Sequence, residues 1–123
     1  MNDLIHIVYV SFAQSSLTES QLRHLLHEIR RKNAAQNVTG LLLYNEGSFI
    51  QVIEGNRDTI HKVFENISKD QRHTNVVKLL EEPIKERAFP DWAMGFRRIS
   101  NKQTKDIRGF SNFMHEPNPI KAI

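Results

Sequence analysis

Two polar side chains, those of Tyr9 and Gln51, stand within apolar runs that are typical of β-strands. Gln51 lies between Ile50 and Val52, and a buried amide needs a hydrogen-bond partner for each of its donors and acceptors. A hydrogen bond between Tyr9 and Gln51 would satisfy the phenol and half of the amide. The other half of the amide then remains for a bound molecule, unless a water completes a purely structural pair.

Three further residues admit either a structural or a ligand-binding role. Asn33 closes a helical stripe, so it is expected either as a C-cap, because asparagine tolerates the left-handed conformation, or as a ligand-facing side chain. Trp92 and Met94 alternate on an expected strand and should share one face. They are suited to core packing or, as an indole and a thioether beside a buried amide, to a stacked or switchable pocket.

A polar loop and the histidines supply the remaining candidates for chemistry. Residues 70–73 form either a solvated loop or a phosphate contact through Arg72, whose planar guanidinium suits a phosphate. His24 and His27 lie one helical turn apart, but a metal site needs a third protein ligand, so no metal is expected. The sequence has no glycine-rich phosphate loop, and no serine, histidine and aspartate set for nucleophilic catalysis can be assembled.

Hydrophobic periodicity predicts the elements that carry these residues. Thr18 and Gln21 fit a capping box, and an apolar stripe with helical spacing follows from Leu22 to Ile29. Residues 45–47, Asn-Glu-Gly, are typical of a hairpin turn. The expected elements are strands at 4–11, 37–44, 48–54, 76–81 and 92–98, and helices from Thr18 to about Asn33 and across 60–67.

The order strand–helix–strand–strand–helix–strand is the split βαβ pattern of ferredoxin-like α+β folds, here with one additional C-terminal strand. Right-handed crossovers place the first and third strands side by side in the middle of the sheet, with both helices on one face. Tyr9 and Gln51 can then meet on that sheet. Both sheet faces carry apolar residues, so we expect the tail of the chain or a second subunit to cover the face opposite the helices.

Composition bounds the class of protein. At 123 residues, with 39% hydrophobic and 25% charged residues, one globular domain is expected rather than a disordered chain. No apolar stretch is long enough to span a bilayer and no signal peptide is evident, so we expect a cytoplasmic location and no membrane partner. The absence of cysteine excludes disulfides, thiolate metal sites and cysteine nucleophiles. A net charge of +3 is too small to indicate a dedicated nucleic-acid binder.

Five motifs in chain order resemble a BLUF domain, a blue-light sensor that uses FAD, in its short stand-alone form. The motifs are Tyr9 with Ser11, Asn33 followed by Asn-Val-Thr-Gly-Leu-Leu at 37–42, Phe-Ile-Gln-Val-Ile-Glu-Gly at 49–55, Asp-Gln-Arg-His at 70–73 and Phe-Pro-Asp-Trp-Ala-Met at 89–94. Each motif alone is weak, but five in order over residues 3–98 are specific. The resemblance implies a flavin-binding domain at 1–98 and a short C-terminal extension at 99–123.

The resemblance implies FAD held without covalent attachment between two helices on one side of the sheet. The flavin-binding residues that it implies are Tyr9, Ser11, Lys32, Asn33, Gln51, Asp70, Arg72 and His73. Tyr9 corresponds to the tyrosine that gives an electron and a proton to the excited flavin, and Gln51 to the glutamine that bridges it to the ring. Asn33 corresponds to the asparagine that hydrogen-bonds the carbonyl edge of the isoalloxazine.

The same resemblance implies a route for the signal. Rearranged hydrogen bonds of Gln51 bias the last strand, where Trp92 and Met94 match a pair proposed to exchange positions. The output then passes to an oligomer interface or to a separate partner protein, without catalytic turnover. Two positions depart from the family pattern: Ala93 replaces a serine, and Lys32 stands where many relatives carry asparagine or histidine.

Two other functions fit the fold less well. A ferredoxin-like nucleic-acid-binding module, the alternative reading, would need aromatic residues on its first and third strands, and the third strand offers Phe49 but no basic-glycine-aromatic signature. A small acylphosphatase-like hydrolase needs an arginine in its first loop, and residues 12–17 contain none. The sequence therefore predicts a flavin-based light sensor.

Overall fold

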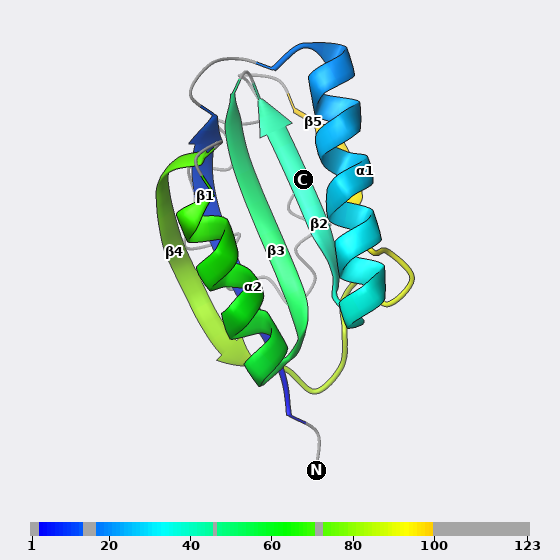
Figure 1. Ribbon diagram of the computed structural model, residues 1–123. Helices are drawn as coiled ribbons and strands as arrows, with labels where there is room; N and C mark the ends of the chain where they lie inside the picture. Colours follow the sequence, from blue (N-terminus) through cyan, green and yellow to red (C-terminus); the bar gives the residue numbers. More distant parts are fainter. Residues whose placement is uncertain (1–2, 14–16, 46, 71–72, 100–123) are drawn as a thin grey trace.

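The computed structural model describes residues 3–13, 17–45, 47–70 and 73–99. In chain order, these residues form β1 (Leu4–Ala13), α1 (Glu19–Gln36), β2 (Thr39–Asn45), β3 (Ser48–Asn56), α2 (Arg57–Lys69), β4 (His73–Pro83) and β5 (Gly95–Arg98). Both helices lie against the same face of one sheet (Figure 1). The predicted ferredoxin-like α+β fold, with an additional C-terminal strand, is therefore confirmed.

The sheet places Tyr9 beside Gln51. Its strand order is β4-β1-β3-β2-β5, so β1 and β3 lie together at the centre, as predicted. β1 and β3 are antiparallel, and their register sets Tyr9 directly opposite Gln51. Directly opposite residues project to the same face of a sheet. Both side chains consequently point toward the helices.

The two ends of α1 differ in how well the sequence predicted them. At its start the capping box is present, with the Gln21 backbone N–H donating to Thr18 Oγ1 at 3.1 Å and the Thr18 N–H donating to Gln21 Oε1 at 2.9 Å. At its end, the expectation that Asn33 caps the helix is wrong. The helix runs another turn to Gln36, and Asn37 adopts the left-handed conformation with φ 57° and forms the cap.

The core on the helix side joins the sheet to both helices. β1 and β3 contribute alternating residues, as the period of a strand requires, and each helix contributes one apolar stripe. The buried members are Ile5, Ile7, Tyr9, Leu22, Leu25, Leu26, Val38, Leu42, Tyr44, Phe49, Ile53, Ile60, Val63 and Met94. Ile5, Ile7 and Tyr9 of β1 thus share the helix-side face with Phe49 and Ile53 of β3.

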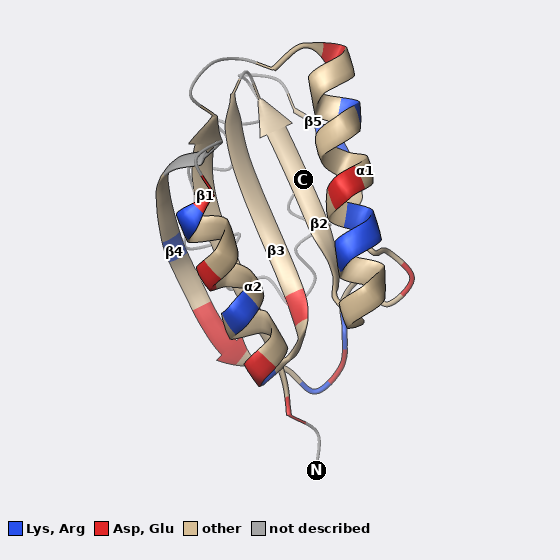
Figure 2. Ribbon diagram, viewed as in Figure 1, with Lys and Arg blue, Asp and Glu red and all other residues tan. Residues whose placement is uncertain are grey.

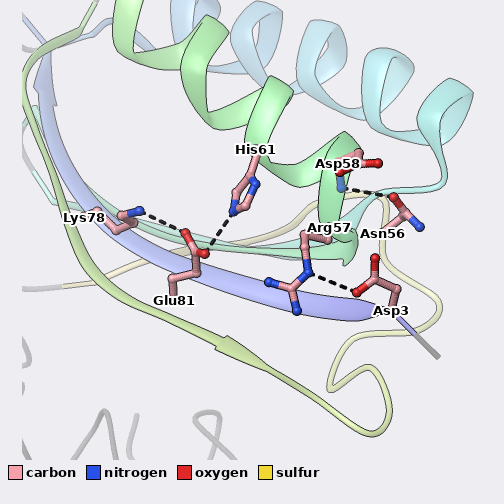
Figure 3. A network of polar contacts seen from close by, with 7 residues as sticks. All are labelled: Asp3, Asn56, Arg57, Asp58, His61, Lys78 and Glu81. Atoms are coloured by element: carbon pink, nitrogen blue, oxygen red, sulfur yellow. Dashed lines mark hydrogen bonds and ion pairs between the residues drawn. The ribbon is translucent and has the colours of Figure 1, made fainter. Parts of the chain in front are cut away.

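Polar contacts tie α2 to the neighbouring strands (Figure 3). Asn56 caps the helix by accepting from the Asp58 backbone N–H at 3.1 Å, and Arg57 pairs with Asp3 at 3.0 Å. His61 and Lys78 both reach the carboxylate of Glu81 on β4, each at 2.9 Å. Along both helices, acidic and basic residues alternate rather than gather by sign (Figure 2).

The sheet face opposite the helices is only partly covered by the described residues. Phe89, from the segment between β4 and β5, and Ile99, just after β5, pack on it with residues of β1, β2 and β3. Phe12, Val77 and Leu79 are large apolar side chains that stay exposed. The expected covering of this face by the tail or a second subunit stays a prediction, because residues 100–123 lie outside the described residues.

Some predicted boundaries shift. β3 ends at Asn56 rather than at residue 54, and the chain passes directly into α2, which begins at Arg57 rather than at residue 60. The last strand begins at Gly95 rather than Trp92, because the Trp92 N–H turns back to the Phe89 carbonyl at 3.2 Å before the chain joins β2 in parallel.

Candidate functional site

A short chain of side-chain contacts links Tyr9, Gln51 and Met94 beneath the helices. The Tyr9 hydroxyl donates to Gln51 Oε1, and Gln51 Nε2 contacts the Met94 sulfur at 3.9 Å. All three side chains are buried. A thioether is a weak acceptor, and an amide nitrogen carries two N–H donors. Gln51 therefore keeps a donor for a stronger acceptor, which is the spare capacity that the sequence predicted.

The environment of Tyr9 keeps its phenol neutral. The ring is fully buried and meets the ring of Phe64 edge-on, with centroids 5.3 Å apart. Burial raises the pKa of Tyr9 well above its usual value, because a phenolate would lose its hydration there. The hydroxyl consequently stays a donor to Gln51 across the physiological pH range.

A cavity of about 150 Å³ opens between α1 and α2 over β3. Its walls combine apolar side chains and polar groups from both helices and from β3. The lining residues are Leu25, Glu28, Ile29, Lys32, Asn33, Gln36, Gln51, Ile53, Val63, Asn66, Ile67, Asp70 and Met94. The six apolar residues can pack on the faces of a flat ring, and the seven polar residues can meet hydrogen-bonding atoms on its edge.

The last turns of α1 hold the chain that precedes β5. Asn33 is buried, and its side-chain Nδ2 donates to the Ala93 carbonyl at 2.7 Å. One turn earlier, Arg30 Nε donates to the Met94 carbonyl at 2.8 Å. Because Asn33 also lines the cavity, a molecule bound there touches a side chain that fixes the position of residues 93 and 94.

Comparison with known proteins decides the family. The family model described as "Sensors of blue-light using FAD" matches residues 4–95, which is most of the chain. The chain belongs to the BLUF family. BLUF domains bind FAD, and the family match ends where β5 begins.

Relatives of this BLUF domain include much longer proteins. The chain is 36% identical over 92 residues to the photoactivated adenylate cyclase subunit beta of Euglena longa, covering 74% of this chain and 11% of that protein. It is 29% identical over 86 residues to the blue light- and temperature-regulated antirepressor BluF of Escherichia coli (strain K12), covering 70% of this chain and 21% of that protein. The chain thus spans a small part of these curated relatives.

Some solved structures that resemble this chain are close to it in length. The dark-state structure of BlrB, a BLUF protein, superimposes with a TM-score of 0.78 at 29% identity, covering 99% of this chain and 92% of that chain. The photo-activated state of BlsA gives a TM-score of 0.74 at 26% identity, covering 96% of this chain and 89% of that chain. A bacterial light-regulated adenylyl cyclase gives a TM-score of 0.76 at 30% identity, covering 90% of this chain and 33% of that chain.

The structure corrects the expectation that Trp92 and Met94 share a face. Met94 is buried on the helix side against Gln51, whereas Trp92 is 45% exposed and stacks on Phe89 at 5.7 Å between centroids. Strand alternation does not apply to them, because both residues precede β5. In this structure of the BLUF domain, the methionine is therefore the member of the pair beside the candidate site.

The other predicted flavin-binding residues divide into two groups. Lys32, Asn33, Gln51 and Asp70 line the cavity together, and Lys32 also pairs with Glu28 at 3.1 Å. Ser11 is buried on β1, two residues after Tyr9, but does not line the cavity. Arg72 lies outside the described residues, and His73 is described only as the first residue of β4.

Sequence reasoning missed three residues that hold this BLUF site together, namely Arg30, Glu54 and Arg87. The available signal was a glutamate at position 54, the end of an apolar strand; it is fully buried in the structure, and a buried charge must be paired or hydrogen-bonded. Within the described part of the chain, no three metal-ligating side chains come together. Neither described helix has the length and apolar character needed to cross a membrane.

Proposed function

We propose that this chain is a blue-light photoreceptor that binds FAD between α1 and α2. The observation that carries the proposal is the buried Tyr9–Gln51 hydrogen bond, which ends at a cavity with a spare amide donor. Gln51 and Asn33 would meet the polar edge of the flavin ring, Lys32 would lie near it, and Leu25, Ile29 and Val63 would flank its faces. Ser11, Asp70, Arg72 and His73 complete the proposed set.

Gln51, which lines the cavity, and its partner Tyr9, which does not, are arranged for a transfer that occurs only in light. Bound FAD supplies blue-light absorption and an excited state that is a strong oxidant. With FAD bound, Tyr9 would give an electron to the excited ring, and its hydroxyl proton would leave along the existing hydrogen bond to Gln51 Oε1. After the electron and the proton have returned to Tyr9, the Gln51 amide would be left rotated or tautomerised. In a buried site such a rearranged hydrogen-bond network reverts slowly.

The proposed signal leaves through the residues that contact Gln51. A changed Gln51 amide alters its contact with Met94, whose backbone leads directly into β5. Among the described residues β5 lies at an edge of the sheet and pairs with β2 alone, so it can shift more easily than the central strands of the site. We propose that β5 passes the signal to an oligomer interface or a downstream protein, with residues 1–98 as the sensor and 99–123 as an extension. The cytoplasmic location stays a prediction.

Flavin binding tests the proposal directly. The cavity is smaller than usual small-molecule sites, which measure about 300–1,000 Å³, so the side chains or helices that line it must move to admit the ring. Protein purified from flavin-replete cells should be yellow, release FAD on denaturation and unfold at a higher temperature when saturated with FAD. A colourless protein that also fails to bind added FAD would refute the proposal.

A further inference from the structure

The segment that connects β4 to β5, residues 84–94, is anchored by a buried carboxylate that does not line the cavity. Glu54 on β3 is fully buried. Its Oε2 accepts the Ala88 N–H at 2.8 Å, and its Oε1 accepts the Phe89 N–H at 2.9 Å and the Thr39 hydroxyl at 2.7 Å. Two consecutive backbone amides of the connection thus end on one side chain of the central sheet.

Arg87 strengthens the same anchor. Its guanidinium donates to Thr39 Oγ1 at 2.8 Å, to the Glu54 carbonyl at 3.1 Å and to the Asn37 carbonyl at 2.8 Å. Arg87 therefore joins the connection to the end of α1, the start of β2 and the end of β3. Hydrogen bonds to charged groups are about twice as strong as neutral ones, so this anchor is stiff.

From this anchor, hydrogen bonds continue along the connection to the cavity. The Phe89 carbonyl accepts from the Trp92 N–H at 3.2 Å, and the Trp92 carbonyl accepts from the Gly40 N–H at 3.0 Å. The Ala93 and Met94 carbonyls then accept from Asn33 and Arg30. The backbone from residue 88 to residue 94 is consequently held at most of its residues, which fixes the place from which the Met94 side chain reaches Gln51.

We propose that Glu54 is a positioning residue for the photosensory site: by anchoring residues 88 and 89, it sets how firmly Met94 is held against Gln51. The inference rests on the proposed function. A firmly held Met94 allows two distinct packed arrangements with a barrier between them, because close-packed interiors do not deform continuously. A loosened anchor lowers that barrier. Weakening Glu54 should therefore speed the return from the lit state to the dark state.

Two variants test the anchor without touching the cavity. Glu54→Gln removes one acceptor oxygen and places an N–H against a backbone N–H, and Thr39→Val removes the hydroxyl between Glu54 and Arg87. Leu80→Ala, on the edge strand β4, is the control for lost packing, and Glu65→Gln on α2 is the control for a lost surface carboxylate. Each protein is loaded with FAD, and its dark-recovery rate and the resonance of the Met94 methyl group are measured.

We expect both anchor variants to recover about two- to tenfold faster than the parent, the range that one hydrogen bond is worth, and to shift the Met94 methyl resonance. The two controls should do neither, even where Leu80→Ala lowers the unfolding temperature as much. Equal recovery rates and an unmoved methyl resonance in folded Thr39→Val would overturn the role of Glu54. If the parent shows no light response, the proposed function fails, and the methyl resonance alone decides whether Glu54 positions Met94.

Discussion

Tyr9 and Gln51 face each other across the two central, antiparallel strands, and the Tyr9 hydroxyl donates to Gln51 Oε1. The pairing is dictated by the register of β1 and β3, so the backbone brings the two groups together before any ligand is bound. A buried phenol joined to a buried amide at the floor of a cavity is a costly arrangement unless each polar group is satisfied. A bound flavin ring would satisfy the remaining amide donor.

Asn33 should contribute to flavin affinity. Asn33→Ala removes a side chain that lines the cavity and also releases the Ala93 carbonyl. We expect FAD affinity to fall about tenfold, which corresponds to about 1.4 kcal/mol for lost hydrogen bonds. Fluorescence titration of the apoprotein with FAD measures the change. Arg31→Ala, on the exposed side of the same helix, is the control, and equal affinities of Asn33→Ala and Arg31→Ala would contradict the role.

The capping box should be worth a measurable part of the stability. Thr18→Ala removes the acceptor of the Gln21 N–H at the start of α1. We expect the free energy of unfolding to fall by about 1 kcal/mol, the usual cost of a lost N-cap. Urea unfolding of the flavin-free protein measures it. Ser20→Ala, in the first turn of the same helix, should change the stability by less than about 0.5 kcal/mol, and similar losses in both variants would argue against the box.

Gly40 should tolerate no side chain. A Cβ at this position would lie 2.0 Å from the Val52 carbonyl oxygen on the neighbouring strand, so β2 would have to leave β3. We expect Gly40→Ala to lose about 3 kcal/mol or more in unfolding free energy, at the upper end of overpacking costs. At Gly55 the nearest atom is the Ile60 Cδ1 at 3.2 Å, the flexible end of a side chain. Gly55→Ala should therefore cost clearly less, and the reverse order would be inconsistent with the packing of this sheet.

Glu81 should make the free energy of unfolding depend on pH in the acid range. Hydrogen bonds from Lys78 and His61 lower the pKa of Glu81 from 4.5 to about 2 (Figure 3). Because the pKa is lowered in the folded state, the stabilisation is present above pH 4.5 and is lost as the pH falls toward 2. Glu81 and its two partners are solvent-accessible, so their contribution to stability is small and is screened by salt. The stability difference between the parent and Glu81→Gln should shrink between pH 5 and pH 2, and a difference that stays constant would contradict it.

Most of the fold could be predicted from sequence, because periodicity and capping are local. The stripe of α1, the box at Thr18 and the alternation along β1 each depend on neighbours within a few residues. The end of α1 was harder to predict, because both Asn33 and Asn37 suit a helix end. The hydrogen bond from Asn33 to the Ala93 carbonyl, which decides the role of Asn33, joins residues that are 60 positions apart. The placement of Trp92 failed for the same reason, since a turn at Phe89 displaced the start of the last strand.

The site could be predicted where its residues break a local pattern, and not where they depend on distant contacts. Tyr9 and Gln51 stood out because polar side chains in apolar strands need partners, and their pairing followed from the topology. Glu54 carried the same signal but lies at the end of its strand, where a carboxylate is usually solvated. Its partners are backbone amides of a distant connection, which no local pattern marks.

The light-induced absorption difference spectrum of the FAD-loaded protein tests the central claim most directly. The account predicts a red shift of the flavin bands after blue light in the parent, and its loss in both Tyr9→Phe and Gln51→Leu with FAD still bound. Tyr44→Phe, which changes the other tyrosine of the chain, should keep the shift. A parent that holds FAD but does not respond to light, or a normal red shift and recovery in Gln51→Leu, would contradict it.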